Sequence, residues 1–247
     1  MPDLLIEAVA LWKRFDAVEV LRGVSFALAR GETLAVMGGS GSGKTVLLRL
    51  IAGLLRPDRG HVRVFGRSVE RLSEEELLPI RRRLGYVFQS AALFDSLTVY
   101  ENVAFPLHEH RRLPEREVRD RVLRALERVG LDGDVLRLLP AELSGGMRKR
   151  VGIARTLMME PEVILYDEPT AGLDPTNARL VTDLLSQVGA DLCDTAIVVT
   201  HELPVVSRVA DRVAVLIDGQ FAKIGPVDEV LRSDDRAVRA FLAGEAR

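Results

Sequence analysis

The segment GGSGSGKT at residues 38–45 constrains the fold of this chain more than any other feature. It fits the pattern GxxxxGK[ST], follows the apolar run 33–37 and precedes the apolar-periodic segment 46–55. That order predicts a strand, a glycine-rich turn and a helix, which together form a phosphate-binding loop. The sequence therefore predicts an α/β fold in which the end of a central strand meets a nucleotide.

The residue types of this phosphate loop suit a triphosphate. Glycine lets successive backbone N–H groups point inward, and the N-terminus of the following helix adds a partial positive charge. We expect Lys44 to reach the β and γ phosphates of ATP, and the Thr45 hydroxyl to bind Mg²⁺. The residues predicted to bind ATP here are Gly38, Gly39, Ser40, Gly41, Ser42, Gly43, Lys44 and Thr45.

Length and composition limit the classes of protein to consider. The 247 residues allow one large α/β domain with an inserted subdomain, and the single cysteine, Cys193, excludes a disulfide framework or a four-cysteine zinc site. A net charge of −2 does not favour nucleic acid as a partner. Asp3 and Glu7 argue against a signal peptide, and no apolar run approaches the roughly 18 residues of a spanning helix. We therefore expect a soluble, cytoplasmic chain.

Apolar periodicity predicts a nucleotide-binding core interrupted by a helical insertion. The strands predicted before the insertion are residues 4–11, 24–28, 61–65 and 84–88, with a turn near Asp16. Residues 90–159 have a helical pattern, with an amphipathic stretch over 111–128. We expect breaks in this pattern near Pro106, Pro114 and Pro140.

Alternating strands and helices return after residue 160. The predicted buried strands are 163–166, 196–200 and 213–217, the helices between them are 176–188 and 204–210, and Asp218-Gly219 predicts a hairpin to 220–224. Strands separated by helices imply a mostly parallel sheet. We predict one domain over 1–240, with a core at 1–89 and 160–232, a helical subdomain at 90–159 and a tail at 233–247.

Two carboxylates end the first of these buried strands. Asp167 and Glu168 would lie at the edge where open α/β sheets bind ligands. We predict that Asp167 holds Mg²⁺ and that Glu168 acts as the general base that polarises an attacking water.

The segment LSGG at residues 143–146, which we call the signature segment, completes a recognisable set. Ser144 is placed to cap a helix, and Gly145 and Gly146 leave its backbone amides open to an anion. A phosphate loop, LSGG and a strand ending in Asp-Glu, in this order, resemble the ABC-type ATPases over residues 4–231. In that family the signature segment of one subunit covers the ATP bound by the phosphate loop of another.

The resemblance implies roles for four further residues. Gln89 matches the glutamine that reaches Mg²⁺ and the attacking water, and His201 matches the histidine that contacts the γ-phosphate. Asp174 matches the loop that crosses the dimer. Phe15 matches the aromatic residue that stacks on adenine, although tyrosine is usual there and Trp12 is a nearby alternative.

The sequences LFDSLTVYENVAFPL, LSGGMRKR and LYDEPTAGLDP further resemble the ATPases of MCE-associated, Mla-type lipid transporters. That resemblance implies a dimer of this chain, transmembrane permease subunits, an MCE-domain lipid-binding partner and a place on the cytoplasmic face of the inner or plasma membrane. Other possibilities are an ABC importer or exporter of another solute, and a non-transport ABC protein acting on DNA or ribosomes.

Two segments have open interpretations at this point. Leu93, Phe94 and Leu97, within residues 91–106, could pack in the helical subdomain or line the groove that accepts a permease helix. Residues 235–247 could form a terminal helix, contact a second copy or be disordered.

Overall fold

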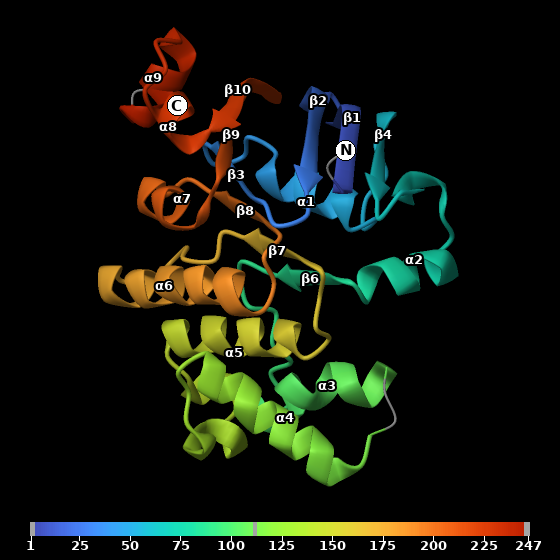
Figure 1. The fold of residues 1–247 in the computed structure, drawn as a ribbon, viewed down its shortest axis with the longest axis vertical. Coiled ribbons are helices and arrows are strands. Elements are labelled where there is room, and N and C mark those ends of the chain that lie inside the picture. The colour runs from blue at the N-terminus through green and yellow to red at the C-terminus, as the bar shows by residue number, and fades with distance from the viewer. Residues whose placement is uncertain (1–2, 111–112, 245–247) are drawn as a thin grey trace.

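A computed structural model describes residues 3–110 and 113–244, and its strands form two sheets (Figure 1). The strands are β1 (Leu4–Phe15), β2 (Val18–Ala29), β3 (Thr33–Gly38), β4 (Arg59–Val64), β5 (Arg67–Ser68), β6 (Leu84–Val87), β7 (Val163–Asp167), β8 (Ala196–Thr200), β9 (Arg212–Ile217) and β10 (Gln220–Pro226). The helices are α1 (Lys44–Ile51), α2 (Glu74–Arg81), α3 (Val99–His110), α4 (Glu115–Arg128), α5 (Gly145–Leu157), α6 (Pro175–Asp191), α7 (Leu203–Val209), α8 (Val227–Leu231) and α9 (Arg236–Leu242). Short 3-10 turns are η1 (Val69–Arg71), η2 (Gly133–Arg137) and η3 (Pro140–Glu142).

The larger sheet has the strand order β10-β9-β3-β8-β7-β6, and all its neighbours are parallel except the β9–β10 pair. Every residue of β3, β7 and β8 is buried. A strand covered on both faces needs apolar residues throughout, which explains the unbroken apolar runs. The α/β fold class predicted from the sequence is confirmed, and β8 lies between the strands that lead to the phosphate loop and to Asp167.

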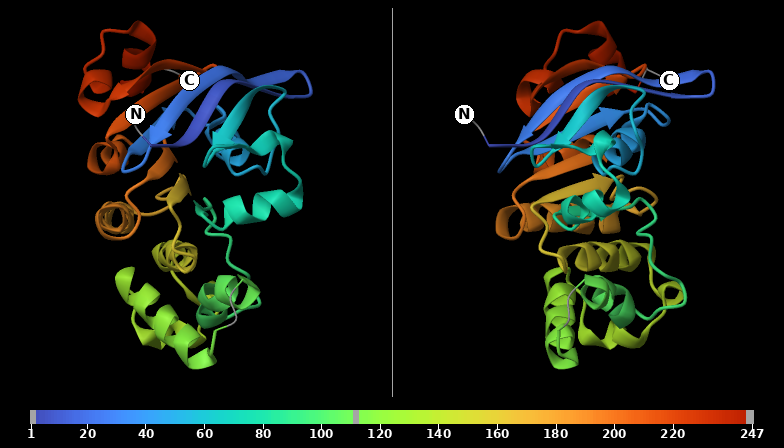
Figure 2. Two further views of the ribbon diagram at one scale, coloured as in Figure 1. Left: turned by 45° about the vertical axis from the view of Figure 1, so that its right-hand side comes forward. Right: turned by 90° about the vertical axis from the view of Figure 1, so that its right-hand side faces the viewer.

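The smaller sheet is antiparallel, in the order β2-β1-β4-β5, and α1 packs between it and the parallel sheet (Figure 2). The predicted turn near Asp16 joins β1 to β2, and Asp16 has a positive φ of 50°. The two sheets share one core. Its fully buried members include Leu21, Leu28, Leu34, Leu47, Leu50 and Ile51.

The predicted hairpin at Asp218-Gly219 is also confirmed, because this pair joins β9 to β10 and both residues have positive φ. The turn lies against β2. The Arg22 N–H donates to the Gly219 carbonyl over 2.7 Å, and a Cβ on Gly219 would come within 2.7 Å of the Val20 carbonyl oxygen. Glycine is therefore required where the two sheets touch.

Helices α3, α4 and α5 pack together at the end of the molecule opposite the antiparallel sheet (Figures 1 and 2). The predicted amphipathic helix is confirmed as α4, with Val118, Val122, Leu126 and Val129 buried and Leu123 partly buried. Arg111 and Arg112, the first residues of that prediction, lie outside the described residues.

The prediction of a break near Pro106 is wrong. Pro106 lies inside α3, where it removes one backbone hydrogen bond. Val99, Val103 and Leu107 of the same helix are fully buried. Their burial outweighs the lost bond, so the helix continues through the proline. Breaks do occur at Pro114, which precedes α4, and at Pro140, which begins η3.

The predicted helical segments are also longer than the helices of the structure at two places. Residues 90–98 form turns rather than helix, and they are held by the fully buried side chain of Asn102. The helix predicted over 46–55 begins at Lys44 and ends at Ile51. Gly53, with φ of +65°, turns the chain away because a left-handed residue stops a helix.

Of the three possibilities for residues 235–247, a terminal helix is found. Asp235 caps α9 by accepting from the backbone N–H groups of Ala237 and Val238. Val238 is fully buried in a cluster with Met37 and Val215 of the parallel sheet. Residues 245–247 lie outside the described part. Among the described helices, none has the length and hydropathy needed to cross a bilayer.

Candidate functional site

The phosphate loop connects the end of β3 to the start of α1, and its shape depends on two glycines. A Cβ on Gly38 would come within 2.4 Å of the Ser42 Oγ and 2.8 Å of the Leu216 carbonyl oxygen. Gly43 has φ of +105° and packs directly on Val20 and Leu21 of β2. No other residue fits at these positions without moving the loop.

The side chain of Lys44 is folded into this loop and is 6% exposed. Its Nζ donates to the carbonyls of Gly38 and Gly39 over 2.8 and 2.9 Å. The same Nζ lies 3.2 Å from the Glu168 Oε1. The lysine therefore has three oxygen partners, two of the loop backbone and one carboxylate.

Asp167 ends β7, and each of its two carboxylate oxygens accepts a different hydroxyl. Thr45 donates to Oδ1 over 2.8 Å and Tyr86 donates to Oδ2 over 3.2 Å. Burial and the neighbouring carboxylate raise the pKa of Tyr86 above its ordinary value, so the phenol stays protonated. This arrangement fixes the plane of the Asp167 carboxylate.

The residues around the loop fit a magnesium-bound triphosphate. Hydroxyl and carboxylate oxygens are the ligands that Mg²⁺ prefers, and Thr45 and Asp167 present them within hydrogen-bond distance of each other. The Ser42 Oγ, inside the loop, is a buried polar atom with no hydrogen-bond partner among the described residues. A buried hydroxyl without a partner suits a ligand that supplies one.

Glu168 follows Asp167 in a left-handed backbone conformation, with φ of +45°. Its backbone N–H donates to the Val199 carbonyl over 3.0 Å. Its carboxylate contacts Lys44 through Oε1, and Oε2 lies 3.0 Å from the His201 Nδ1. The turn after β7 thus points the Glu168 carboxylate toward both the phosphate loop and the residue that follows β8.

These groups surround one pocket of about 520 Å³. Its lining residues are Val20, Gly39, Ser40, Gly41, Ser42, Gly43, Lys44, Thr45, Val46, Gln89, Glu168, Ala171 and His201. The structure therefore brings the predicted phosphate loop together with Gln89, Glu168 and His201, which come from four separate parts of the sequence. Asp167 lies behind this surface and reaches it through Thr45.

Phe15 does not line this pocket. It ends β1 with 42% of its surface exposed, and the Lys13 Nζ lies 5.4 Å from its ring centroid. The alternative residue, Trp12, packs over Gly23 and the guanidinium of Arg59. Of the two aromatic candidates, Phe15 has the more exposed ring.

The signature segment lies outside the pocket as well. Ser144 caps α5 by accepting from the Met147 N–H over 3.2 Å. A Cβ on Gly146 would come within 2.4 Å of the Asn177 Oδ1, and Gly145 packs near Leu173. The signature segment therefore adjoins the start of α6 in its own chain.

Asp174 lies at this second location and caps α6. It accepts from the Thr176 and Asn177 backbone N–H groups over 3.1 Å each, and from the Asn177 side-chain amide over 2.6 Å. These hydrogen bonds, chiefly from Asn177, hold the pKa of Asp174 below its ordinary value. The predicted site residues thus fall into two groups, one around the phosphate loop and one around the signature segment.

A family model described as ABC transporter matches residues 21–171, more than half of the chain. This chain belongs to the ABC transporter ATPase family. Members of the family bind and hydrolyse ATP, and this ABC ATPase is accordingly an ATP-binding enzyme of a transporter.

Several relatives of this ABC ATPase have names that refer to transport or to lipids. The intermembrane phospholipid transport system ATP-binding protein MlaF of Haemophilus influenzae is 40% identical over all of this chain and 93% of the relative. The chloroplastic protein trigalactosyldiacylglycerol 3 of Arabidopsis thaliana is 42% identical over 98% of this chain and 74% of the relative. A probable ribonucleotide transport ATP-binding protein, mkl, of Mycobacterium leprae is 40% identical over 97% of this chain and 69% of the relative.

Two solved structures show the same architecture. The ATP-binding cassette MJ0796, in a dimeric post-hydrolysis state bound to ADP and phosphate, has a TM-score of 0.84 at 32% identity, over 90% of this chain and 98% of the other. The protein cbiO1 of Clostridium perfringens, part of the ABC transporter complex cbiONQ, has a TM-score of 0.83 at 32% identity, over 97% of this chain and 95% of the other.

Sequence reasoning missed two residues of the site, Tyr86 and Lys149. Tyr86 contacts Asp167 from the neighbouring strand, and no local pattern indicates that pairing. Lys149 of α5 is buried and donates to the backbone at Gln89 and Glu168. A signal for its burial exists, because it lies three residues after Gly146 and four before Ile153, both on the inner face of the helix.

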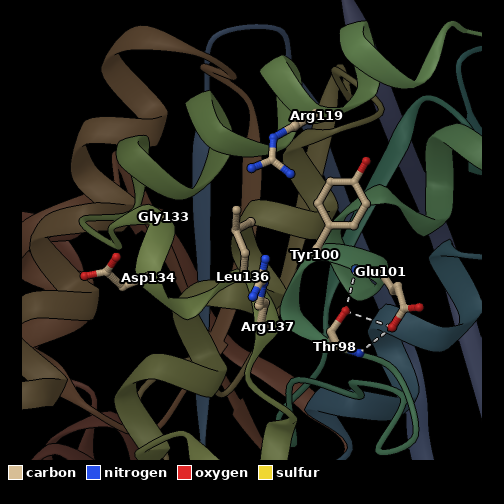
Figure 3. A pocket seen from close by; sticks show the side chains of 8 residues that line it. All are labelled: Thr98, Tyr100, Glu101, Arg119, Gly133, Asp134, Leu136 and Arg137. Atoms are coloured by element: carbon tan, nitrogen blue, oxygen red, sulfur yellow. Dashed lines mark hydrogen bonds between the residues drawn. The ribbon is translucent and has the colours of Figure 1, made fainter.

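A second pocket, of about 420 Å³, lies among α3, α4 and η2 (Figure 3). The Glu101 carboxylate in this pocket accepts from the backbone N–H and the hydroxyl of Thr98, over 2.8 Å each, at the start of α3. Tyr100 in its wall donates to Glu115. None of the predicted site residues lines this pocket.

Proposed function

We propose that this ABC ATPase hydrolyses Mg-ATP as a dimer and drives phospholipid transport, with transmembrane permease subunits and an MCE-type lipid-binding protein as partners. It would act on the cytoplasmic face of the membrane that holds the permease. The observation that carries the enzymatic part is the convergence of Lys44, Glu168 and His201 on the phosphate-loop pocket. The lipid cargo is supported by the relatives named for phospholipid transport, one of them aligned over the whole chain.

The residues of the pocket, together with Asp167 and Phe15 outside its lining, have proposed parts in ATP binding and hydrolysis. The loop amides and Lys44 bind the phosphates, and Phe15 stacks on the adenine. Thr45, Asp167 and Gln89 would hold Mg²⁺, which supplies positive charge to the phosphate oxygens. Glu168 polarises the attacking water, and His201 orients the Glu168 carboxylate and the γ-phosphate.

A second copy of the chain is supported by the place of the signature segment. Ser144, Gly145 and Gly146 have the open amides of an anion site but do not line the pocket of their own chain. We propose that they cover the ATP of a second copy, with Asp174 at the contact between the two. ATP would then join the copies, and hydrolysis would release them.

We also propose that the predicted core and the predicted helical subdomain have separate functions. Helices α3, α4 and α5 form a helical subdomain over 90–159 that receives the permease, while 1–89 and 160–232 bind ATP. Phe94 is 44% exposed, and its ring is tilted against that of Phe105 at 4.7 Å between centroids, which supports a docking role for the 91–106 segment beside its packing role.

The substitution Glu168→Gln tests the enzymatic proposal. The amide keeps the shape of the side chain but cannot accept a proton from water, so we expect ATP to bind while steady-state hydrolysis falls about 100-fold or more. Nucleotide binding and phosphate release, measured on the same preparation, separate these effects. Hydrolysis at the wild-type rate would show that Glu168 is not the base.

The cargo needs a separate measurement. Purification of the chain from membranes should bring down permease subunits and an MCE-domain protein if phospholipid is the cargo. A second candidate, transport of another solute, is favoured by the ribonucleotide-transport name of the mycobacterial relatives, of which this chain spans about two thirds. Recovery of a solute-binding protein in place of an MCE protein would support that candidate.

A further inference from the structure

We propose that Lys149 is a positioning residue of the ATPase site. Its buried ammonium holds the backbone of Glu168 and of Gln89, and so links the orientation of α5, the helix that begins at the signature segment, to that of the Glu168 carboxylate. This inference rests on the proposed role of Glu168 as the general base.

The contacts of Lys149 are unusual for a charged side chain. It is 6% exposed, and its Nζ donates to the Gln89 carbonyl over 2.6 Å and to the Glu168 carbonyl over 3.1 Å. No carboxylate among residues 3–110 and 113–244 forms an ion pair with it. A buried charge is costly unless its donors are satisfied, and these two carbonyls, with the nearby charges of Glu168, Asp167 and Glu202, offset that cost.

Glu168 needs such support because its backbone is strained. A residue with a Cβ is disfavoured at a φ of +45°, and the surrounding structure has to hold it there. The Glu168 N–H is fixed by the Val199 carbonyl, and its carbonyl is fixed by Lys149. Loss of the second contact would free the backbone to relax and would turn the carboxylate away from Lys44 and His201.

The same helix holds the chain on the far side of Gln89. Arg155 of α5 donates to the carbonyls of Ala91 and Ala92 over 2.9 and 2.8 Å, and Gly152 packs directly against Ala91. Lys149 is the member of this set that also reaches Glu168. A rotation of α5 would therefore move the Gln89 loop and the Glu168 backbone together.

The test compares Lys149→Met with Lys149→Arg and Lys149→Gln in the full chain. Methionine keeps an unbranched, flexible side chain, one atom shorter, but removes every donor, so kcat for ATP hydrolysis should fall about 10- to 100-fold. Lys149 does not line the pocket, and KM for ATP should change by less than about threefold. The arginine and glutamine variants keep N–H donors and should fall between wild type and Lys149→Met.

Arg150→Met is the matched control. Arg150 is also on α5 and also donates to two backbone carbonyls, those of Val129 and Gly130, but it touches neither Gln89 nor Glu168. We expect its kcat to stay near wild type, and thermal melting of all variants identifies any that fail to fold. An equal loss of kcat in Arg150→Met and Lys149→Met, at equal folded fraction, would overturn the proposal.

A second measurement keeps the two proposals apart. If Lys149 acts through Glu168, Lys149→Met should not lower the residual rate of Glu168→Gln any further, because the positioned group is already gone. A further 10-fold loss in the double variant would overturn the positioning role. Full activity of Lys149→Met beside an inactive Glu168→Gln refutes this inference alone, whereas an active Glu168→Gln refutes the proposed base.

Discussion

At the residue scale, the side chains of the candidate site are positioned by hydrogen bonds and ion pairs to their polar atoms. Asp167 has one hydroxyl on each carboxylate oxygen, and Lys44 has an oxygen partner for each of its three N–H groups. The sequence motif accounts for Lys44, Thr45 and Asp167, because their spacing to the glycines and the buried strand is local. The contacts of Tyr86 and Lys149 could not be predicted, because the partner of Tyr86 is 81 residues away in the sequence and the nearer partner of Lys149 is 19 residues away.

The hydroxyl of Tyr86 is expected to matter for the metal. In Tyr86→Phe, one oxygen of Asp167 loses its donor while the ring and its stacking on Phe88 are kept. Removal of such an outer contact typically weakens a metal site about tenfold or more, so the Mg²⁺ concentration for half-maximal ATPase rate should rise by about that factor. Tyr100→Phe, which removes a hydroxyl bonded to Glu115, should leave the Mg²⁺ dependence unchanged. A Tyr86→Phe titration identical to wild type would contradict this role.

At the scale of elements, the sequence was most informative where a strand or helix is buried along its whole length. Strands β3, β7 and β8 follow from unbroken apolar runs, and α4 follows from its amphipathic spacing. Local propensity predicts a break at Pro106, but burial of one face of α3 outweighs that propensity and the helix continues. The turns at 90–98 depend on two side chains from other elements, Asn102 of α3 at residues 94–98 and Arg155 of α5 at Ala91 and Ala92.

The Asn102 amide is therefore expected to be important for stability. It is fully buried, donates to the carbonyls of Phe94, Leu97 and Thr98, and accepts from the Phe94 N–H. In Asn102→Ala the Phe94 N–H and the Leu97 carbonyl lose their partner, while the Phe94 and Thr98 carbonyls keep the backbone N–H groups of Leu97 and Asn102. Two buried groups left without a partner should lower the free energy of unfolding by about 2–4 kcal/mol. Urea unfolding measures the change, and Gln187→Ala, at an exposed position on α6, serves as the control. A loss below about 0.5 kcal/mol would mean that the loop is held by other contacts.

At the scale of the whole molecule, the signature segment does not line the phosphate-loop pocket of its own chain, and the proposed dimer would bring it to the pocket of a second copy. This can be tested by complementation. A chain with Lys44→Ala should bind ATP poorly, and a chain with Ser144→Arg should block the site of its partner, so each alone should be inactive. Mixing them equally should restore up to about a quarter of the wild-type rate, because half of random dimers are mixed and each has one intact site. No recovery, with mixed dimers shown to form, would contradict sites shared between copies.

The packing of the phosphate loop on the antiparallel sheet has a consequence for how this protein can change. Gly43 lies against Val20 and Leu21, and the β9–β10 turn presses on the same strand from Gly219. Strand β2 supplies no proposed catalytic group, but the phosphate loop packs directly against it. Substitutions that alter its side chains for rigidity or solubility would also alter nucleotide affinity, so an engineer cannot adjust the two properties independently along this strand.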